Sequence, residues 1–386
     1  MSAAAPRRRR VLVTGGAGYV GSHVLLRLAA RGHDAVALDN LYAGHAWAVG
    51  EVPLLRVDLG DREALGRSPG GAGFEAMFHC APNIGVGEWA REPARYYRNN
   101  TCNAIGLFDL CARHGVRDVV LSSTAAVYGE PGKPLIDEDT PLAPINPYGA
   151  SKMMAERALA DIAQAHGLRF VALRYFNVAG ADGDGRLGEA TPDNSHLIKV
   201  ACETAIGLRP FMRINGTDYP TPDGTCIRDY VHVDDLAEAH VLALDHLAAD
   251  GRSGALNVGY GHGFSVREVL DTVRRVTGVA FPIVEGPPGS RRGRPAARRR
   301  TRLAAAPRRS RADRGHGVAL GAAPPRDPRD DAGLSGAADG CWAGACGLGR
   351  AAPMRHETRH PPAWTMPADR RPSLLWAGIV ALFVLF

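Results

Sequence analysis

The feature that most constrains this 386-residue chain lies near its start, where a strand-like apolar run meets three spaced glycines. Residues 11–13 predict a buried strand, and a helical pattern follows over residues 19–30. In such a strand–turn–helix unit, Gly15 allows the tight turn, Gly18 lets a pyrophosphate approach the backbone and Gly21 lets helix and strand pack closely. Free N–H groups at the helix N-terminus then favour phosphates. The arrangement predicts a dinucleotide site, and the alternative is a glycine-rich turn without a ligand.

A second apolar run, at residues 34–38, ends in Asp39 at the spacing expected for an acid that binds the adenine ribose. Four more strand-like runs follow and alternate with two long helical patterns. The strands are predicted at residues 53–57, 76–79, 118–121 and 170–173, and the helices at residues 93–114 and 147–165. This alternation predicts an α/β fold, a Rossmann-type doubly wound parallel sheet whose strands end at one edge, where the ligand binds.

Tyr148 and Lys152 stand four residues apart in the second predicted helix, so their side chains share one helix face. An ammonium group favours a nearby phenolate, and a positive nicotinamide would act in the same direction. We therefore expect the pKa of Tyr148 to fall from about 10 toward neutrality, which would make it a general base. Such pairs also arise by chance on solvated helix faces. The upstream glycine turn and the Ser-Ser-Thr sequence at residues 122–124 favour the catalytic interpretation.

The net charge of +6 is unevenly distributed along the chain. Residues 291–386 contain 18 arginines and no lysine against 7 acids, a net charge of +11, so residues 1–290 carry −5. The basic character therefore belongs to the C-terminal segment. Because the remainder is mildly acidic and shows no basic stripe interleaved with aromatic residues, we expect no nucleic-acid partner.

The seven cysteines form no paired C-x-x-C motif, so neither a disulfide framework nor a metal site is indicated. This usage is typical of a reducing compartment, and we expect a cytoplasmic location. Residues 1–10 are basic, but the apolar run after them is too short for a signal peptide because it enters the glycine turn directly. They are expected to form an N-terminal extension.

Several motifs together resemble a known group of proteins. The glycine spacing, the sequence at residues 122–124 and the Tyr148-Gly-Ala-Ser-Lys152 motif are similar to the extended short-chain dehydrogenase/reductase superfamily. Within that superfamily, the chain resembles the UDP-hexose 4-epimerases over about residues 10–290. The matching segments lie at residues 39–41, 86–88, 96–100, 122–129, 174–177 and 216–232.

The resemblance implies an NAD-dependent isomerase that interconverts UDP-glucose and UDP-galactose through a 4-keto sugar. Phenolate Tyr148 would take the proton of the sugar 4-hydroxyl while hydride leaves C4 for the nicotinamide. The keto sugar would then rotate, and hydride would return to its opposite face. Thr124 would hydrogen-bond the reacting oxygen, and Lys152 would hold the cofactor ribose and tune Tyr148.

The same resemblance implies further binding residues. NAD contacts are expected from Gly15, Gly18, Tyr19, Val20, Asp39, Asn40, Asp58, Leu59, Cys80, Ala81, Asn99, Ser122, Tyr148, Lys152, Tyr175 and Phe176. The UDP-sugar is expected to contact Thr124, Tyr148, Asn177, His196, Leu197 and Arg228. The alternatives are a turn-capping role for Asn177 and a structural ion pair for Arg228. The family further suggests a homodimer through the two long helices.

Sugar-nucleotide 4,6-dehydratases carry an acidic pair after the threonine, whereas Ala125 and Ala126 follow Thr124 in this chain. The acid needed to eliminate water is therefore missing. Two alternatives stay open: a catalytically impaired NAD-binding protein, and a related epimerase or decarboxylase acting on a uronic acid or an N-acetylated sugar. We expect an NAD-binding domain over residues 11–176 and a substrate domain, interleaved with it, over residues 177–290.

The resemblance ends near residue 291, inside a motif rather than at a domain boundary. Residues 291–386 contain no Tyr, Asn, Gln or Lys and show no sustained periodicity. Our hypothesis is that this segment comes from a gene read out of frame, and the alternative is a disordered basic tail. The apolar run at residues 374–386 would reach roughly 20 Å as a helix, which is short for a membrane span. We expect no membrane partner, with a weak tail anchor as the alternative.

Overall fold

The computed structural model of the protein describes residues 7–67, 73–84, 90–132, 136–192 and 194–286. The predictions for residues 1–6, 86–88 and 291–386, including the apolar run at residues 374–386, lie outside the described residues. No helix among the described residues is long and apolar enough to cross a membrane.

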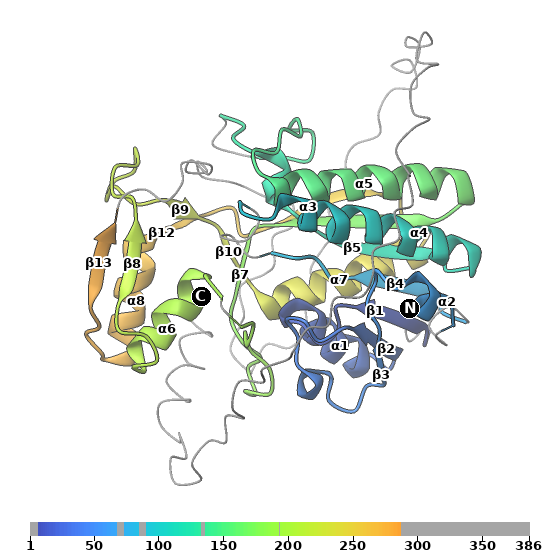
Figure 1. Ribbon diagram of the computed structural model, residues 1–386, viewed down its shortest axis with the longest axis horizontal. Coiled ribbons are helices and arrows are strands. Elements are labelled where there is room, and N and C mark those ends of the chain that lie inside the picture. Colours follow the sequence, from blue (N-terminus) through green and yellow to red (C-terminus); the bar gives the residue numbers. More distant parts are fainter. Residues whose placement is uncertain (1–6, 68–72, 85–89, 133–135, 193, 287–386) are drawn as a thin grey trace, which may run out of the picture. The chain divides into compact units, whose positions relative to one another are not determined.

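A seven-stranded parallel sheet organises the larger part of the fold (Figure 1). Its strands are β1 (Arg10–Thr14), β2 (Asp34–Asp39), β3 (Leu54–Arg56), β4 (Ala76–His79), β5 (Asp118–Thr124), β6 (Arg169–Tyr175) and β11 (Gly254–Val258). They stand in the order β11-β6-β5-β4-β1-β2-β3. The chain runs outward from β1 toward β3 and then returns to β4 on the other side, so the topological switch point lies between β1 and β4. The predicted Rossmann-type sheet is confirmed.

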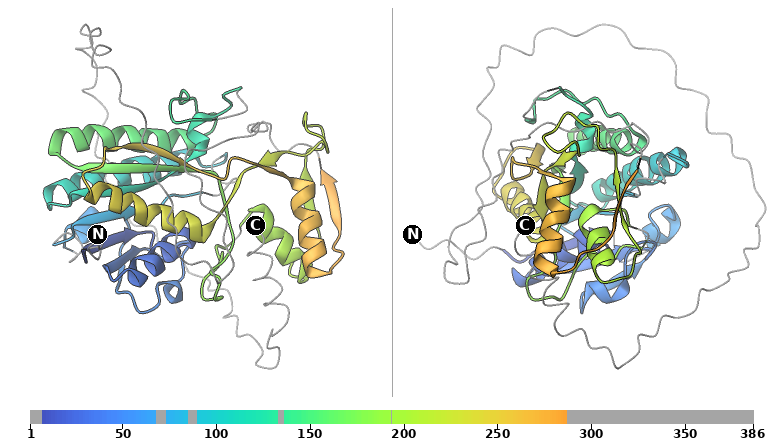
Figure 2. Two further views of the ribbon diagram at one scale, coloured as in Figure 1. Left: turned by 180° about the vertical axis from the view of Figure 1, so that it is seen from behind. Right: turned by 90° about the vertical axis from the view of Figure 1, so that its left-hand side faces the viewer.

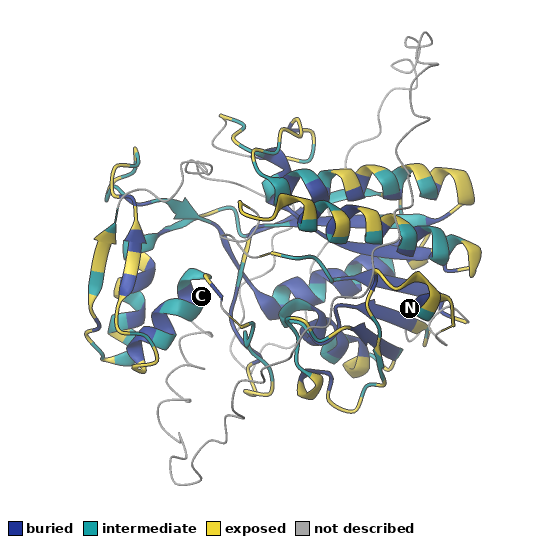
Figure 3. Cartoon of the chain, viewed as in Figure 1, coloured by how far each residue is buried: buried dark blue, intermediate teal, exposed yellow. Residues whose placement is uncertain are grey.

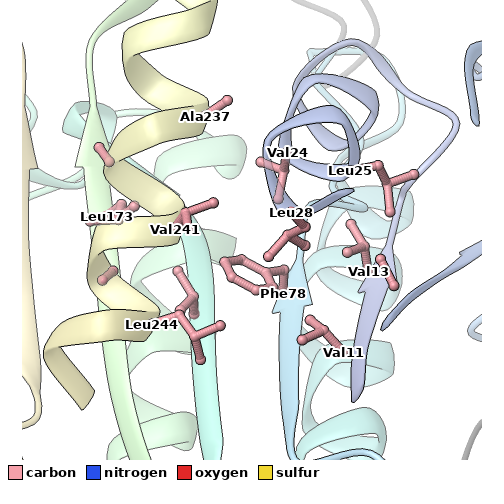
Figure 4. Close-up of a cluster of buried hydrophobic side chains, with 14 of the residues drawn as sticks. Val11, Val13, Val24, Leu25, Leu28, Phe78, Leu173, Ala237, Val241 and Leu244 are labelled. Carbon is pink, nitrogen blue, oxygen red and sulfur yellow. The ribbon is translucent and has the colours of Figure 1, made fainter. Parts of the chain in front are cut away.

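Helices cover both faces of this sheet (Figures 1 and 2). Helices α1 (Tyr19–Ala30) and α7 (Val233–Ala248) pack on one face, and α4 (Ala104–Arg113) and α5 (Pro147–His166) pack on the other. The strands supply the two layers by alternation, since Val11 and Val13 face the first helix pair and Leu12 faces the second. Figure 4 shows Phe78 of β4 between side chains of α1 and α7. In Figure 3 the central strands of this sheet are buried, whereas the outer surfaces of α4 and α5 are exposed.

Three of the differences between the sequence predictions and the structure concern the elements around the carboxyl edge of the sheet and its outer strand. The helix predicted at residues 93–114 is divided into α3 (Pro93–Tyr96), a π-helical segment (Tyr97–Asn103) and α4. Strand β5 continues through Thr124, three residues beyond its predicted end. Strand β11 was not predicted, because its Gly and Asn weaken the strand signal.

The remaining elements lie mainly in the second part of the chain. Short connections in the first part are α2 (Arg62–Arg67) and the 3-10 turns Ala46–Val49 and Ala125–Tyr128. The later elements are β7 (Asn177–Ala179), α6 (Leu197–Ala205), β8 (Met212–Asn215), β9 (Ile227–Arg228), β10 (Tyr230–His232), β12 (Phe264–Ser265), α8 (Val266–Thr277) and β13 (Ile283–Gly286). Strand pairs β10–β7, β12–β9 and β13–β8 form three small sheets. A separate apolar cluster joins α6, α8, β8 and β13.

Candidate active site

The glycine turn after β1 has the geometry that its spacing predicts. Gly15 adopts a φ of +71°, and a Cβ there would lie 2.3 Å from the Cys80 carbonyl oxygen. A Cβ on Gly21 would lie 2.1 Å from the Gly15 carbonyl oxygen, so helix α1 could not pack as it does with any larger residue. Gly18 meets only that same carbonyl, at 3.3 Å, and has no other atom within 4 Å. The backbone at Gly18 is therefore open to a phosphate at the start of α1.

Asp39, at the end of β2, stabilises this turn by hydrogen bonds. Its carboxylate accepts the backbone N–H of Ala17 at 3.0 Å and that of Leu41 at 2.8 Å. Burial raises the pKa of Asp39, and these two N–H groups act against that rise. The Asn40 side chain donates to Asp58 at 2.6 Å, so the structure brings together two residues predicted at the adenosine end. The buried Leu59 follows directly.

Thr124, Tyr148 and Lys152 lie where β5 ends and α5 begins. The Asn146 side chain caps α5 by accepting the Gly149 N–H at 2.8 Å, and a proline follows at the first helical position. Thr124 Oγ1 accepts the Ala126 N–H at 3.1 Å. This contact does not use the hydrogen of the Thr124 hydroxyl, and Thr124 hydrogen-bonds the Tyr148 phenol. The structure brings together the predicted oxygen-binding hydroxyl and the predicted base.

Lys152 is 1% exposed, and its Nζ has no hydrogen-bond partner among the described residues. Burial lowers the pKa of Lys152 to about 8, and the charge of Glu156, one helical turn away, acts in the opposite direction. A buried ammonium with three unused N–H donors is costly unless a ligand supplies acceptors. The open backbone at Gly18 and this free ammonium both fit a dinucleotide, whose phosphates and ribose hydroxyls would meet them.

The protein's own residues do not supply the fall in the pKa of Tyr148 that is expected with oxidised NAD bound. Burial raises the pKa of the Tyr148 phenol to about 12, and the hydrogen bond from Thr124 only partly opposes that rise. Loss of water around the phenol disfavours its ionised form. Desolvation is the larger effect here, so the protein's own residues keep this phenol protonated at neutral pH.

Other predicted NAD contacts gather at the ends of neighbouring strands. Cys80 and Ala81 follow β4, Ser122 lies in β5, and Tyr175 ends β6 opposite Thr124. The Asn99 amide, in the π-helical segment, donates to the Ala81 carbonyl oxygen at 3.1 Å.

Three more predicted NAD contacts flank this group. Tyr19 and Val20 begin α1, and the Tyr19 hydroxyl donates to the Gly180 carbonyl oxygen at 2.6 Å. Phe176 is buried directly after Tyr175, and its backbone N–H donates to Val258 of β11 at 3.2 Å.

The predicted substrate residues fall into two groups. Asn177 donates its side-chain amide to the Asp229 carbonyl oxygen at 3.1 Å, which places it next to Arg228. The guanidinium of Arg228 has one described hydrogen bond, to the Ile227 carbonyl oxygen, and no ion pair among the described residues. Arg228 therefore keeps its charge available for an anion, and the structural ion-pair alternative is not seen. Nor does Asn177 cap a turn, since it lies in β7.

His196 and Leu197 form the second group, at the start of α6. The His196 ring contacts the Glu189 carboxylate at 2.5 Å, and its backbone N–H donates to Asn194. No described contact joins these two residues to Asn177 or Arg228. The described residues hold no cluster of His, Cys, Asp or Glu suited to a metal ion.

Sequence reasoning missed a buried polar network beneath α5. Arg174 donates to Glu156 Oε2 from Nη2 at 2.7 Å and from Nε at 3.0 Å, and Glu156 also accepts the Ser123 hydroxyl. Arg174 further donates to the Tyr128 hydroxyl at 2.9 Å. The sequence offers one indication of this network: Glu156 stands four residues after Lys152, and residues four apart share a helix face.

Fold and site together define a Rossmann-type enzyme that uses a dinucleotide, with a Tyr–Lys pair at the carboxyl edge of its sheet. The family model for the NAD dependent epimerase/dehydratase family matches residues 11–259. The chain belongs to this family.

Named relatives agree with this assignment. The chain is 56% identical over 282 residues to a UDP-glucose 4-epimerase of Azospirillum brasilense, covering 73% of this chain and 80% of the relative. It is also similar to the solved UDP-glucose 4-epimerase from Brucella ovis in complex with NAD, with a TM-score of 0.71 and 44% identity over 75% of this chain and 88% of that one. The enzyme from Bifidobacterium longum, in complex with NAD+ and UDP, has a TM-score of 0.68 and 34% identity over 74% and 87% of the two chains. The predicted resemblance and the NAD cofactor are thus confirmed.

Proposed function

We propose that this protein interconverts UDP-glucose and UDP-galactose by oxidation and re-reduction at C4 of the sugar. One observation carries the proposal: the Thr124 hydroxyl hydrogen-bonds the Tyr148 phenol, while the buried Lys152 ammonium, one turn further along α5, has no partner in the described chain. This is a proton-transfer group beside an unused cation at a dinucleotide site. The names of the similar enzymes support the same activity.

NAD supplies the hydride acceptor and donor when it is bound. Gly15, Gly18, Asp39 and Asn40 bind its adenosine and phosphates, and Lys152 donates to the nicotinamide ribose. Tyr148 receives the proton of the 4-hydroxyl and later returns it, with Thr124 holding the reacting oxygen. Because the surrounding protein raises the pKa of Tyr148, the positive charges of Lys152 and oxidised NAD must favour its phenolate in the complex.

The remaining predicted residues position the substrate. Arg228 binds the diphosphate by charge-assisted hydrogen bonds, and Asn177, His196 and Leu197 complete the UDP site. Arg228 is suited to this role because its guanidinium has no described ion pair. We assign the NAD-binding domain to residues 11–176 and the substrate domain to residues 177–290, with α7 and β11 returning to the first.

The assembly and location follow as part of this proposal. The exposed faces of α4 and α5 carry Ile105 and Met154, which are 38% and 43% exposed, and these faces suit a homodimer. The five described cysteines are all free, which fits a cytoplasmic location. Sedimentation of the purified chain at micromolar concentration tests the dimer, and a Met154→Glu variant should then sediment as a monomer.

The activity is tested by adding UDP-galactose to the purified full-length chain without added NAD. Formation of UDP-glucose, with transient absorbance of reduced nicotinamide, is the expected result. Absence of conversion with NAD still bound would favour the alternative of a catalytically impaired NAD-binding protein. Conversion of only a uronic acid or an N-acetylated sugar nucleotide would assign the chain to a related reaction.

A further inference from the structure

A buried histidine contacts one of the residues that we assign to the cofactor, Ser122. His240 belongs to α7 and is completely inaccessible to solvent. Its ring centroid lies 6.3 Å from that of Phe78 in β4 and 6.2 Å from that of Tyr175 in β6, so the imidazole lies over β5, the strand between them. Both ring nitrogens are within hydrogen-bond distance of a partner, Leu236 and Ser122.

The positions of the hydrogens in this group follow from its partners. His240 Nδ1 lies 2.8 Å from the Leu236 carbonyl oxygen, which can only accept, so Nδ1 carries the proton. Burial lowers the pKa of His240 to about 4, so the ring is neutral at neutral pH and its Nε2 is a bare acceptor. Ser122 Oγ lies 2.7 Å from Nε2 and must therefore donate its only hydrogen to His240.

The direction of this hydrogen bond determines how Ser122 interacts with its other neighbours, Cys80 and Tyr175. A serine hydroxyl that has given its hydrogen to His240 can only accept elsewhere. Cys80 Sγ lies 3.1 Å from Ser122 Oγ, and the Tyr175 hydroxyl hydrogen-bonds the same serine. Because Ser122 has no second hydrogen to give, both groups must donate to it.

We propose that His240 is a positioning residue for the NAD pocket, because it makes Ser122 the acceptor that holds the Cys80 thiol and the Tyr175 hydroxyl in place. Burial keeps the pKa of Tyr175 well above its usual value, so its hydroxyl retains the hydrogen that it donates to Ser122. The inference rests on the proposed location of the cofactor, and it concerns binding rather than turnover.

The test is a thermodynamic cycle on NAD affinity with the variants His240→Leu, Ser122→Ala and their combination, made in the full chain. Losing one buried hydrogen bond should weaken NAD binding about tenfold in each single variant. If His240 acts through Ser122, the double variant should be no weaker than the weaker single variant. Effects that multiply to about a hundredfold, or unchanged affinity in either single variant, would overturn the proposal. Affinity is measured without substrate, so failure of the epimerase assay would not affect this result.

A spectroscopic measurement covers the case in which His240→Leu is too unstable to purify. The chain labelled with 15N-histidine should show His240 at pH 7 as a neutral ring with its proton on Nδ1. A His240→Gln variant identifies the resonance by its disappearance from the spectrum. A proton on Nε2, or a charged ring, would contradict the directions that we assign to the hydrogen bonds linking His240, Ser122 and Tyr175.

Discussion

At the scale of single residues, Lys152 illustrates how a binding group can oppose stability. Its ammonium is buried without a described partner, and its pKa is lowered from 10.5 to about 8. Folding therefore disfavours the charged form, and this penalty is fully present below pH 8. The penalty is relieved as the pH rises from about 8 toward 10.5, where the unfolded chain also loses the proton.

We accordingly expect Lys152→Met to stabilise the NAD-free protein by about 1–3 kcal/mol at pH 7 while weakening NAD binding. The advantage should shrink by pH 10. Thermal unfolding of both proteins at the two pH values, after removal of nucleotide, measures the difference. A variant that melts below the original at pH 7 would show that Lys152 has an unseen stabilising contact.

Tyr148 is the residue whose chemistry the proposed activity needs most directly. Tyr148→Phe removes the hydroxyl that exchanges the proton and should reduce turnover by roughly 10²–10⁴-fold. NAD content should be unchanged, because Lys152 and the glycine turn are intact. Tyr42→Phe, at a site 58% exposed, is the matched control and should behave like the original. Turnover retained in Tyr148→Phe would remove this residue from the mechanism.

At the scale of elements, the π-helical segment Tyr97–Asn103 connects the loop after β4 to α5. The fully buried Asn100 accepts the Asn83 N–H at 2.8 Å and donates to the Asn83 carbonyl and to Ser151 Oγ, both at 3.2 Å. This side chain therefore joins the loop after β4 to the helix that carries Tyr148.

Asn100→Ala should destabilise the protein by about 1–3 kcal/mol, because it removes a buried side chain and leaves the part-buried backbone groups of Asn83 without these hydrogen bonds. Cys102→Ala, at an exposed position of the same segment, should change the stability by no more than about 0.5 kcal/mol. Urea unfolding of the three proteins gives the comparison. Equal midpoints for Asn100→Ala and the original would mean that the loop does not depend on this residue.

These elements also show what the sequence could and could not predict. The glycine turn, β4 and α1 follow from local patterns, and α1 begins and ends where its periodicity predicts. The π-helical segment depends on contacts with a distant loop, so a regular apolar stripe cannot reveal it. The same limit applies to the pKa of Tyr148, which burial controls, and to His240, whose partner Ser122 lies 118 positions away.

At the scale of the whole molecule, the question is which part of the chain the function needs. The described residues up to 286 contain the complete seven-stranded sheet, its covering helices and every candidate NAD and substrate residue. They also include the apolar cluster of α6 and α8. By composition, the strongly basic segment begins after these elements, at residue 291.

A chain that stops after residue 290 should therefore retain NAD and unfold with the same midpoint as the full chain, to within about 1 kcal/mol. Its turnover of UDP-galactose should match that of the full chain, because removing residues 291–386 removes none of the groups assigned to the proton, the cofactor or the diphosphate. Side-by-side measurement of NAD content and turnover separates two contributions of the segment. Loss of turnover with NAD retained would assign substrate contacts to residues 291–386, whereas loss of both would make the segment part of the folded core and contradict its interpretation as out-of-frame sequence.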